Sequence, residues 1–256
     1  MHLILTGATG LVGSGVLDAM IKMKEVTKIS IISRRPVKMA EDAKDPRINV
    51  IIHKDFENYD AELLDKVKGA SGCVWALGIS QNQVGKEEYV KITKTFALEA
   101  AKAFRGLPSK PDEPFRFVYV SGAGTTLRPG LFTALFARVK GETEMALAEM
   151  RRANPLFMAS SVRPAFVDAA AHDATKPYLP ARDTMTNAAA AVLGPVIRAG
   201  VFRSAWSPTE PLGRFLTGMA MGKWDGQLEG DGVEKIGEFP ILENKVFRRL
   251  MGLDQK

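Results

Sequence analysis

The sequence contains one cysteine and three histidines in 256 residues. The single cysteine, Cys73, excludes an internal disulfide and a cysteine-rich metal site, because each of these needs more than one thiol. The histidines, His2, His53 and His172, stand far apart in the chain and show no metal-ligand spacing. We therefore expect no metal site.

The sequence also lacks an apolar run long enough to span a bilayer. Its most membrane-like segment, residues 187–202 (NAAAAVLGPVIRAGVF), is interrupted by Pro195 and Arg198 and is shorter than the roughly 20 residues that a span requires. We expect a buried or pocket-lining helix there, while peripheral membrane contact stays open. An apolar strand expected from the third residue leaves no room for a cleaved signal, so we expect a cytoplasmic protein.

The sequence has no segment in which basic residues are concentrated, although its net charge is +6. The lysines and arginines are scattered, without the aromatic-interleaved basic stripe that nucleic-acid binding favours. We expect no nucleic-acid partner, because an anionic small molecule accounts for the excess charge equally well. The length and the 46% hydrophobic content fit a single domain over residues 1–256, with a small appended region.

Short apolar runs alternate with longer segments of helical period along most of the chain. This alternation predicts an α/β fold, a Rossmann-type doubly wound parallel sheet with helices on both faces. The expected strands cover residues 3–7, 28–33, 48–53, 72–77, 115–121 and 156–162. A helix over 87–104 should bury one stripe formed by Val90, Thr93, Ala97, Ala100, Ala101 and Phe104.

The pattern loosens after the sixth expected strand, and we expect residues 165–206 to form a small cap or substrate region over the carboxyl edge of the sheet. A helix should follow over 207–220, where Ser207 and Glu210 have capping-box spacing and Pro208 suits the first turn. A last short helix is expected over 241–252.

The most informative motif is LILTGATGLVGSG, residues 3–15, in which an expected strand runs into Gly7, Gly10 and Gly13 and then into a helix. Glycines at these positions permit a tight turn, let backbone amides approach a pyrophosphate, and let the helix pack closely on the strand. At the first strand-to-helix junction of an alternating α/β chain, the motif predicts dinucleotide binding. The alternative is a purely structural turn.

The second expected strand ends in Ser33, Arg34 and Arg35, where an acidic residue would hold the ribose 2′-hydroxyl of NAD(H). Arginine suits bidentate contact with a phosphate, so the sequence favours NADP(H) over NAD(H). The alternative is a pair of solvated arginines. Asp55 and Phe56 follow the third strand, within reach of an adenine edge.

These motifs resemble the short-chain dehydrogenase/reductase superfamily over nearly the whole chain. The likeness is carried by TGATGLVG at 6–13, SRRP at 33–36, DF at 55–56, ALG at 76–78, VYVSGAG at 118–124, VKGETE at 139–144 and VRPAFV at 162–167. Within the superfamily, the chain is similar to the atypical NAD(P)-binding epimerase-like reductases, which include the Tat-interacting-protein-like oxidoreductases. The resemblance implies further cofactor contacts from Thr9, Leu11, Val12, Leu77, Gly78 and Pro164.

The resemblance also implies a catalytic tyrosine four residues before a lysine that lowers the tyrosine pKa and binds the nicotinamide ribose. Lys140 matches that lysine, but Phe136 occupies the tyrosine position, and a phenyl ring cannot transfer a proton. We expect Lys140 to hold ribose hydroxyls, with Phe136 as an apolar wall beside the nicotinamide. The alternative is an exposed helical lysine next to a core phenylalanine.

The catalytic serine of the superfamily is matched by Ser121, although Gly122 is a second candidate for that position, with Thr125 and Thr126 as substitutes. The cofactor half of the site therefore resembles the superfamily more closely than the proton-transfer half does.

Three functions stay open. The first is an NADP(H)-dependent oxidoreductase acting on a small carbonyl or related compound, with a proton from a hydroxyl, a water or one of the cap-loop residues Asp168, His172 and Asp173. The second is an NADP(H)-binding sensor or interaction protein without turnover. The third is a non-redox isomerase on the same scaffold. The sequence does not identify the small-molecule substrate or the oligomeric state.

Overall fold

The computed structural model of the chain describes residues 1–108, 110, 112–179 and 203–254. In this part of the chain, an eight-stranded sheet runs in the order β3-β2-β1-β4-β5-β6-β10-β9. Its first six strands are β1 (His2–Thr6), β2 (Lys28–Ser33), β3 (Ile48–Ile52), β4 (Gly72–Trp75), β5 (Phe115–Val120) and β6 (Phe157–Arg163). All six strands predicted from the sequence are therefore confirmed, and their pairing is parallel, as a doubly wound fold requires.

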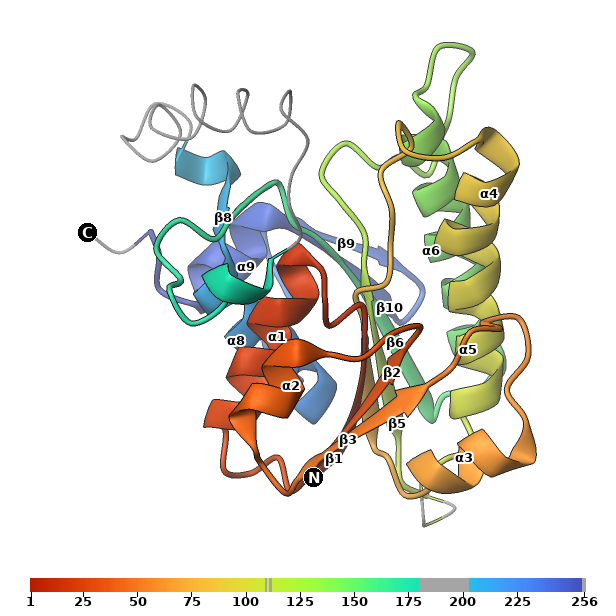
Figure 1. Cartoon of the computed structure of the whole chain (residues 1–256). Helices are drawn as coiled ribbons and strands as arrows, with labels where there is room; N and C mark the ends of the chain where they lie inside the picture. Colours follow the sequence, from red (N-terminus) through yellow and green to blue (C-terminus); the bar gives the residue numbers. More distant parts are fainter. Residues whose placement is uncertain (109, 111, 180–202, 255–256) are drawn as a thin grey trace.

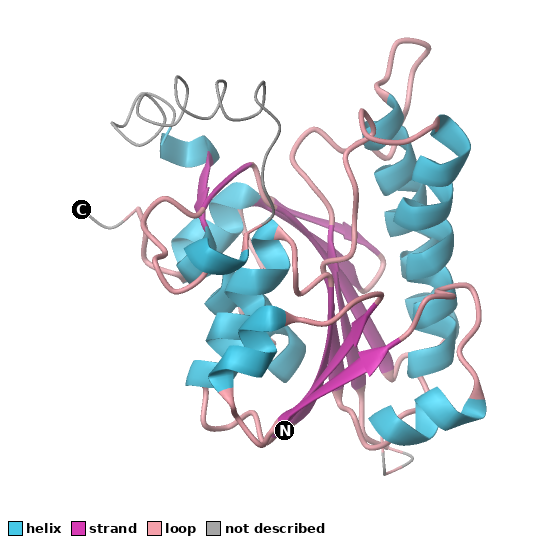
Figure 2. Cartoon of the chain, viewed as in Figure 1, coloured by secondary structure: helices cyan, strands magenta, loops and turns pink. Residues whose placement is uncertain are grey.

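Helices cover both faces of the sheet (Figures 1 and 2). One layer consists of α1 (Leu11–Lys22), α2 (Lys38–Ala43), α8 (Thr209–Met221) and α9 (Asn244–Leu250). The other consists of α3 (Ala61–Val67), α4 (Lys86–Val90), α5 (Phe96–Phe104) and α6 (Leu135–Ala153). A separate hydrophobic core lies between the sheet and each layer, because a central parallel strand is apolar on both faces.

The C-terminal strands were not predicted from the sequence. β9 (Val233–Ile236) and β10 (Phe239–Glu243) form an antiparallel hairpin, and β10 extends the sheet parallel to β6. The helix predicted over 241–252 is therefore wrong at its start, since its first three residues belong to β10. Pairing of these residues with β6 overrides their helical period.

The helix predicted over 87–104 contains a π-helical turn, η1 (Lys91–Thr95), between α4 and α5. The predicted stripe is buried from Thr93 to Phe104, but Val90 is partly exposed and Tyr89 is buried in its place. A π-helical turn contains an extra residue, which shifts the face that the preceding residues present to the core.

The capping box predicted at the start of α8 does not form. Pro208 is the N-cap residue and has no side-chain cap hydrogen bond. Ser207 lies in β8 (Trp206–Pro208), where its hydroxyl donates to Asn244 Oδ1 at 2.6 Å. β8 pairs in parallel with β7 (Phe166–Asp168) in a separate two-stranded sheet.

Two short 3₁₀ helices, η2 (Lys176–Tyr178) and η3 (Arg203–Ala205), flank residues 180–202, which lie outside the described part of the chain. Most of the cap predicted over 165–206 and the helix predicted over 187–202 fall there, so both stay predictions. Among the described residues, no helix is long and apolar enough to cross a membrane.

Glycines allow α1 and α8 to approach each other closely. A Cβ atom on Gly213 of α8 would lie 2.1 Å from the backbone oxygen of Gly15 in α1, far inside van der Waals contact. A Cβ on Gly15 would lie 2.8 Å from the backbone oxygen of Thr209. The two helices can keep this separation only without side chains at the crossing.

We expect Gly213→Ala to lower the free energy of unfolding by about 1–3 kcal/mol, the usual cost of overpacking. In a helix without such a crossing, the same substitution would stabilise by about 1 kcal/mol, so the sign of the change is informative. Chemical denaturation followed by circular dichroism measures it. Gly106→Ala is the control, because nothing lies within 4 Å of the added Cβ there. A Gly213→Ala variant as stable as the native protein would contradict the close crossing.

Candidate functional site

A cavity of about 360 Å³ lies at the carboxyl ends of β1, β2 and β4. Its lining consists of Gly7, Thr9, Ile32, Ser33, Arg34, Arg35, Phe56 and Leu77. All of these except Ile32 are among the residues predicted to contact the cofactor. The fold therefore brings together segments that follow different strands, at the edge where open α/β sheets bind ligands.

The two arginines lie at the surface of this cavity, and Arg35 reaches across it. Its Nη2 donates to Thr9 Oγ1 at 3.3 Å, so the guanidinium extends over the glycine turn. The Ser33 hydroxyl donates to the backbone oxygen of Arg35 at 2.7 Å and fixes the turn that carries both arginines. Arg34 is exposed, and the described part of the cavity lining contains no acidic residue next to it.

The turn between β1 and α1 is built without side chains at its tightest points. Gly7 has a φ of +70°, and a Cβ on it would lie 2.3 Å from the backbone oxygen of Ala76. A Cβ on Gly13 would lie 2.1 Å from the backbone oxygen of Gly7. Gly10 donates its N–H to that same oxygen at 2.9 Å and is the N-cap residue of α1.

The start of α1 fits the pyrophosphate of a dinucleotide. Leu11, Val12 and Gly13 form its first turn, whose N–H groups have no acceptors within the helix and favour an anion. No acidic side chain lies in this turn. At the end of β1, the buried hydroxyl of Thr6 has no hydrogen-bond partner among the described residues and adds an unused polar atom next to the turn.

Several residues predicted to contact the cofactor do not line the cavity: Gly10, Leu11, Val12 and Gly13 of the glycine turn, Lys140, and Asp55, Gly78 and Pro164. Asp55 is exposed, and its carboxylate accepts two hydrogen bonds within its own turn, which lower its pKa. Gly78 is exposed in the loop after β4. Pro164 follows β6, and its backbone oxygen accepts a hydrogen bond from Ala123 N–H at 2.9 Å, which joins the ends of β5 and β6. Their roles stay predictions.

Lys140 reaches from α6 to the carboxyl end of β5. Its Nζ donates to the backbone oxygens of Ser121 at 2.9 Å and Val120 at 3.3 Å, and lies 5.8 Å from the centroid of the Tyr119 ring. Burial lowers the pKa of Lys140 to about 8, although the charge of Glu144 one turn later opposes the shift. The alternative of an exposed helical lysine does not fit these contacts.

Phe136 lies one helical turn before Lys140, between the loops that follow β4 and β5. Its N–H donates to Gln81 Oε1 at 2.9 Å, and its ring edge lies 3.6 Å from where a Cβ would stand on Gly124. No local pattern singles out Gln81, because its contact with α6 depends on the folded positions of the two loops. The ring provides an apolar wall here and no proton donor.

The Ser121 hydroxyl is buried and lies 3.2 Å from the Thr125 hydroxyl, so the two share a hydrogen bond. Gly122 stands between them without a side chain. The Thr126 hydroxyl accepts a hydrogen bond from Arg128 N–H at 3.1 Å. The hydroxyls predicted as proton donors are thus held in local hydrogen bonds at the end of β5.

The cap-loop residues considered as proton donors also make structural contacts. His172 is buried, with Nε2 3.0 Å from Asp18 Oδ2 in α1 and Nδ1 3.0 Å from Thr209 Oγ1 in α8. Asp173 pairs with Lys176, and Asp168 accepts a hydrogen bond from Trp206. These contacts attach the loop to the helices α1 and α8 and to β8.

A buried ion pair that sequence reasoning missed joins α6 to the sheet. Glu144 accepts hydrogen bonds from the Arg163 guanidinium through both carboxylate oxygens and from the Ser161 hydroxyl at 2.7 Å. Arg163 also donates to Glu243 Oε1 of β10 at 2.8 Å. The spacing of Lys140 and Glu144, one helical turn apart, was the available signal that both belong to one helix face.

No family model matches the sequence. Botcinic acid biosynthesis cluster B protein 16 of Botryotinia fuckeliana is 48% identical over 157 residues, which are 61% of this chain and 99% of that protein. Leucinostatins biosynthesis cluster protein T of Purpureocillium lilacinum is 38% identical over 195 residues, 70% of each chain. The chain belongs to the family of these biosynthesis-cluster proteins.

A more distant relative is named protein fmp52, mitochondrial, of Emericella nidulans. It is 30% identical over 144 residues, which are 56% of this chain and 58% of that protein. Because this name places the relative in mitochondria, the cytoplasmic location of the present chain stays a prediction.

Two solved structures show the same fold. A dTDP-glucose 4,6-dehydratase from Streptomyces venezuelae with NAD bound has a TM-score of 0.62 at 16% identity, over 99% of this chain and 80% of that one. A short-chain dehydrogenase/reductase from Saccharomyces cerevisiae has a TM-score of 0.62 at 12% identity, over 95% of this chain and 96% of that one. The predicted Rossmann-type fold is confirmed, whereas the superfamily and the subgroup within it stay predictions.

The depressed pKa of Lys140 predicts a pH dependence of stability. Between about 8 and 10.5, the ordinary value, the unfolded chain binds more protons at this lysine than the folded protein does, so the free energy of unfolding rises with pH. Below pH 8, Lys140 is protonated in both the folded and the unfolded state, so the folded protein bears the full cost of desolvating the ammonium group.

Lys140→Met should remove this contribution. The free energy of unfolding of the native protein, measured relative to the variant by urea denaturation, should therefore rise from pH 8 to pH 10 and level off toward 10.5. Lys68→Met, which removes an exposed charge, corrects for the general effect of lost charge. A difference that stays constant across this range would contradict the burial of the Lys140 ammonium group.

Proposed function

We propose that this protein is an NADP(H)-dependent oxidoreductase that acts on a small carbonyl or related compound. The observation that carries the proposal is the cavity in which Arg34, Arg35 and Ser33 face the glycine turn between β1 and α1. The structural neighbours support it, since the dehydratase with the same fold is described with NAD bound. The names of the two close relatives support a role in a biosynthetic pathway.

The charge on the cavity lining favours the 2′-phosphorylated nucleotide. Among the described residues, the lining contains two arginines and no acidic side chain. A carboxylate at the end of β2 would bind a ribose 2′-hydroxyl and repel a 2′-phosphate, whereas a guanidinium provides paired N–H donors for the phosphate. Both arginines are exposed and can contact a ligand, and among the described residues their guanidinium groups make one hydrogen bond, from Arg35 to Thr9.

The residues around the end of β5 would serve the nicotinamide half of the cofactor. Lys140 holds its ammonium group against the backbone oxygens of this strand, at the position from which the superfamily's lysine binds ribose. Phe136 supplies an apolar wall. The cofactor, when bound, supplies the hydride, and a hydroxyl, a water or a cap residue supplies the proton that Phe136 cannot.

A second function is favoured by two specific observations. Phe136 stands where the superfamily has its proton donor, and the Ser121 hydroxyl is held by Thr125. Both features suit an NADP(H)-binding protein that senses the nucleotide or binds a partner without turnover. The two functions share the cofactor cavity and differ only in whether hydride is transferred.

Replacing both Arg34 and Arg35 with Ala should weaken NADPH binding at least about tenfold, because each charged hydrogen bond lost contributes about 1.5–3 kcal/mol. NADH affinity should change little, since this nucleotide has no 2′-phosphate. Titration calorimetry with both nucleotides measures the difference. Arg105→Ala, at an exposed position after α5, controls for the loss of positive charge. Equal affinities of the native protein for NADPH and NADH would refute the nucleotide preference.

Phe136→Tyr should restore a proton donor with little change in volume. If the protein is a reductase, NADPH consumption with a panel of carbonyl substrates should rise by about 10²- to 10⁴-fold, the usual contribution of a positioned general acid. Phe136→Leu keeps the site apolar and should not raise the rate. Fast turnover by the native protein that Phe136→Tyr leaves unchanged would place the proton source elsewhere. No turnover by either form, with NADPH bound by both, would favour the second function.

A further inference from the structure

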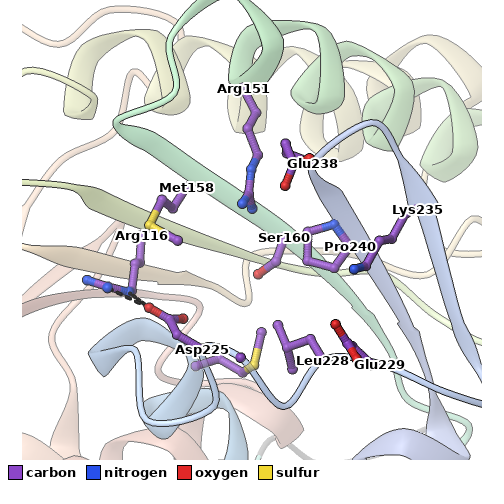
Figure 3. A pocket seen from close by; sticks show the side chains of 12 residues that line it. Arg116, Arg151, Met158, Ser160, Asp225, Leu228, Glu229, Lys235, Glu238 and Pro240 are labelled. Atoms are coloured by element: carbon purple, nitrogen blue, oxygen red, sulfur yellow. Dashed lines mark hydrogen bonds and ion pairs between the residues drawn. The ribbon is translucent and has the colours of Figure 1, made fainter.

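A second cavity, of about 150 Å³, lies near the amino ends of β5 and β6 (Figure 3). It is at the opposite edge of the sheet from the cavity at the carboxyl ends of β1, β2 and β4, which is called the nucleotide cavity below. It exists because β10 pairs with β6 only from Ser161 to Arg163, although β6 begins at Phe157. The edge of β6 before Ser161 therefore has no strand partner among the described residues. The β9–β10 hairpin diverges there and leaves a gap.

Arg151, near the end of α6, crosses this gap. Its Nη1 donates to the backbone oxygen of Ala159 at 2.7 Å, and no other hydrogen bond of its guanidinium is present among the described residues. Burial lowers the pKa of Arg151, although the charges of Glu238 and Asp225 oppose the shift. Figure 3 shows the guanidinium pointing from α6 into the cavity. Most of its donors are thus available to a ligand.

Ser160 provides a second unused polar group. Its side chain is only 4% exposed and points to the face of β6 opposite that of Ser161. Its hydroxyl has no hydrogen-bond partner in the described part of the chain, and Figure 3 shows the oxygen turned into the cavity. The oxygen is accessible from the cavity, so the hydroxyl can donate a hydrogen bond to a ligand there.

The charges around the cavity are mixed. Arg116 is already neutralised, because its guanidinium donates to Asp225 Oδ2 at 2.6 and 3.2 Å. Apart from Arg151, the remaining charged side chains of the lining are exposed and lie at the rim of the cavity, so charges of both signs stand next to it. A ligand that carries a positive and a negative charge close together can pair with both the cations and the carboxylates of the lining. The lining residues that form no ion pair within the described chain are two cations and two carboxylates: Arg151, Lys235, Glu229 and Glu238.

The size and the apolar walls narrow the class of ligand further. The cavity has a volume of about 150 Å³, which is room for a small compound. Met158, Met219 and Pro240 provide apolar surface next to the polar groups.

We propose that this cavity binds a small α-amino acid. Its carboxylate accepts hydrogen bonds from Arg151 and Ser160, and its ammonium group contacts Glu229 or Glu238. The site is distinct from the nucleotide cavity and does not depend on the proposed oxidoreductase activity.

The test compares L-alanine with two probes that each lack one of its charges, propionate and ethylamine. Titration calorimetry with the native protein at millimolar probe concentrations should detect binding of L-alanine and at least about tenfold weaker binding of the other two, since each loses a charged hydrogen bond. Failure of L-alanine to bind, or equal binding of propionate, would overturn the proposal.

Two variants link the binding to this cavity. Arg151→Gln and Ser160→Ala should each weaken L-alanine binding at least about tenfold, since each removes a donor to the carboxylate. The matched control is Arg152→Gln, which alters the exposed neighbour that pairs with Glu149 and lies outside this cavity. Circular dichroism and thermal unfolding confirm that each variant is folded. Unchanged L-alanine affinity in a folded Ser160→Ala variant would overturn the proposal even if Arg151→Gln failed to fold.

Discussion

The contact of α1 with the turn after β1 constrains the half of the molecule that contains the proposed nucleotide cavity. The first turn of α1 can pack against the Gly7 backbone only because Gly13 has no side chain, and Gly7 in turn approaches the end of β4 at Ala76. These contacts hold the start of α1 between the carboxyl ends of two neighbouring strands. The arginines at the end of β2 reach the same space because β2 is the other neighbour of β1. The order of the strands, with β1 between β2 and β4, therefore brings the lining of the cavity together around the glycine turn.

The buried ion pair of Glu144 and Arg163 positions α6, and with it Lys140 at the end of β5. Removing one partner from such a pair leaves a charge in the core without compensation, at a cost of about 3–5 kcal/mol. Here the pair ties α6 to β6 and, through Glu243, to β10. Glu144 is one helical turn after Lys140 on α6. The ion pair of Glu144 with Arg163 therefore also fixes where along the end of β5 the lysine lies. The position of the lysine therefore depends on a carboxylate that is not part of the nucleotide cavity lining.

The parts of the structure that could be predicted from the sequence are those in which the signal is local. Six strands and the glycine turn could be identified because each is a continuous apolar run or a short motif. The hairpin of β9 and β10 was missed, since its strands are short and Gly237 lies in the turn between them. The contact of His172 with Asp18 joins residues 154 positions apart, and no local pattern predicts it. The position of Ser160 on a cavity also has no local signal, because the cavity depends on where β10 pairs with β6.

The combination of Lys140 and Phe136 sets the chemistry that is possible at the end of β5. A lysine lowers the pKa of a phenol one helical turn before it, but the phenyl ring of Phe136 at that position has no proton to transfer. What stays useful is its positive charge, and a pKa of about 8 leaves the amine mostly protonated at neutral pH. A charged amine that already donates to two backbone oxygens is suited to orient ribose hydroxyls rather than to move protons. The proposed function therefore separates two roles that the superfamily's tyrosine and lysine share: it assigns cofactor binding to Lys140 on α6 and the proton to a group outside that helix.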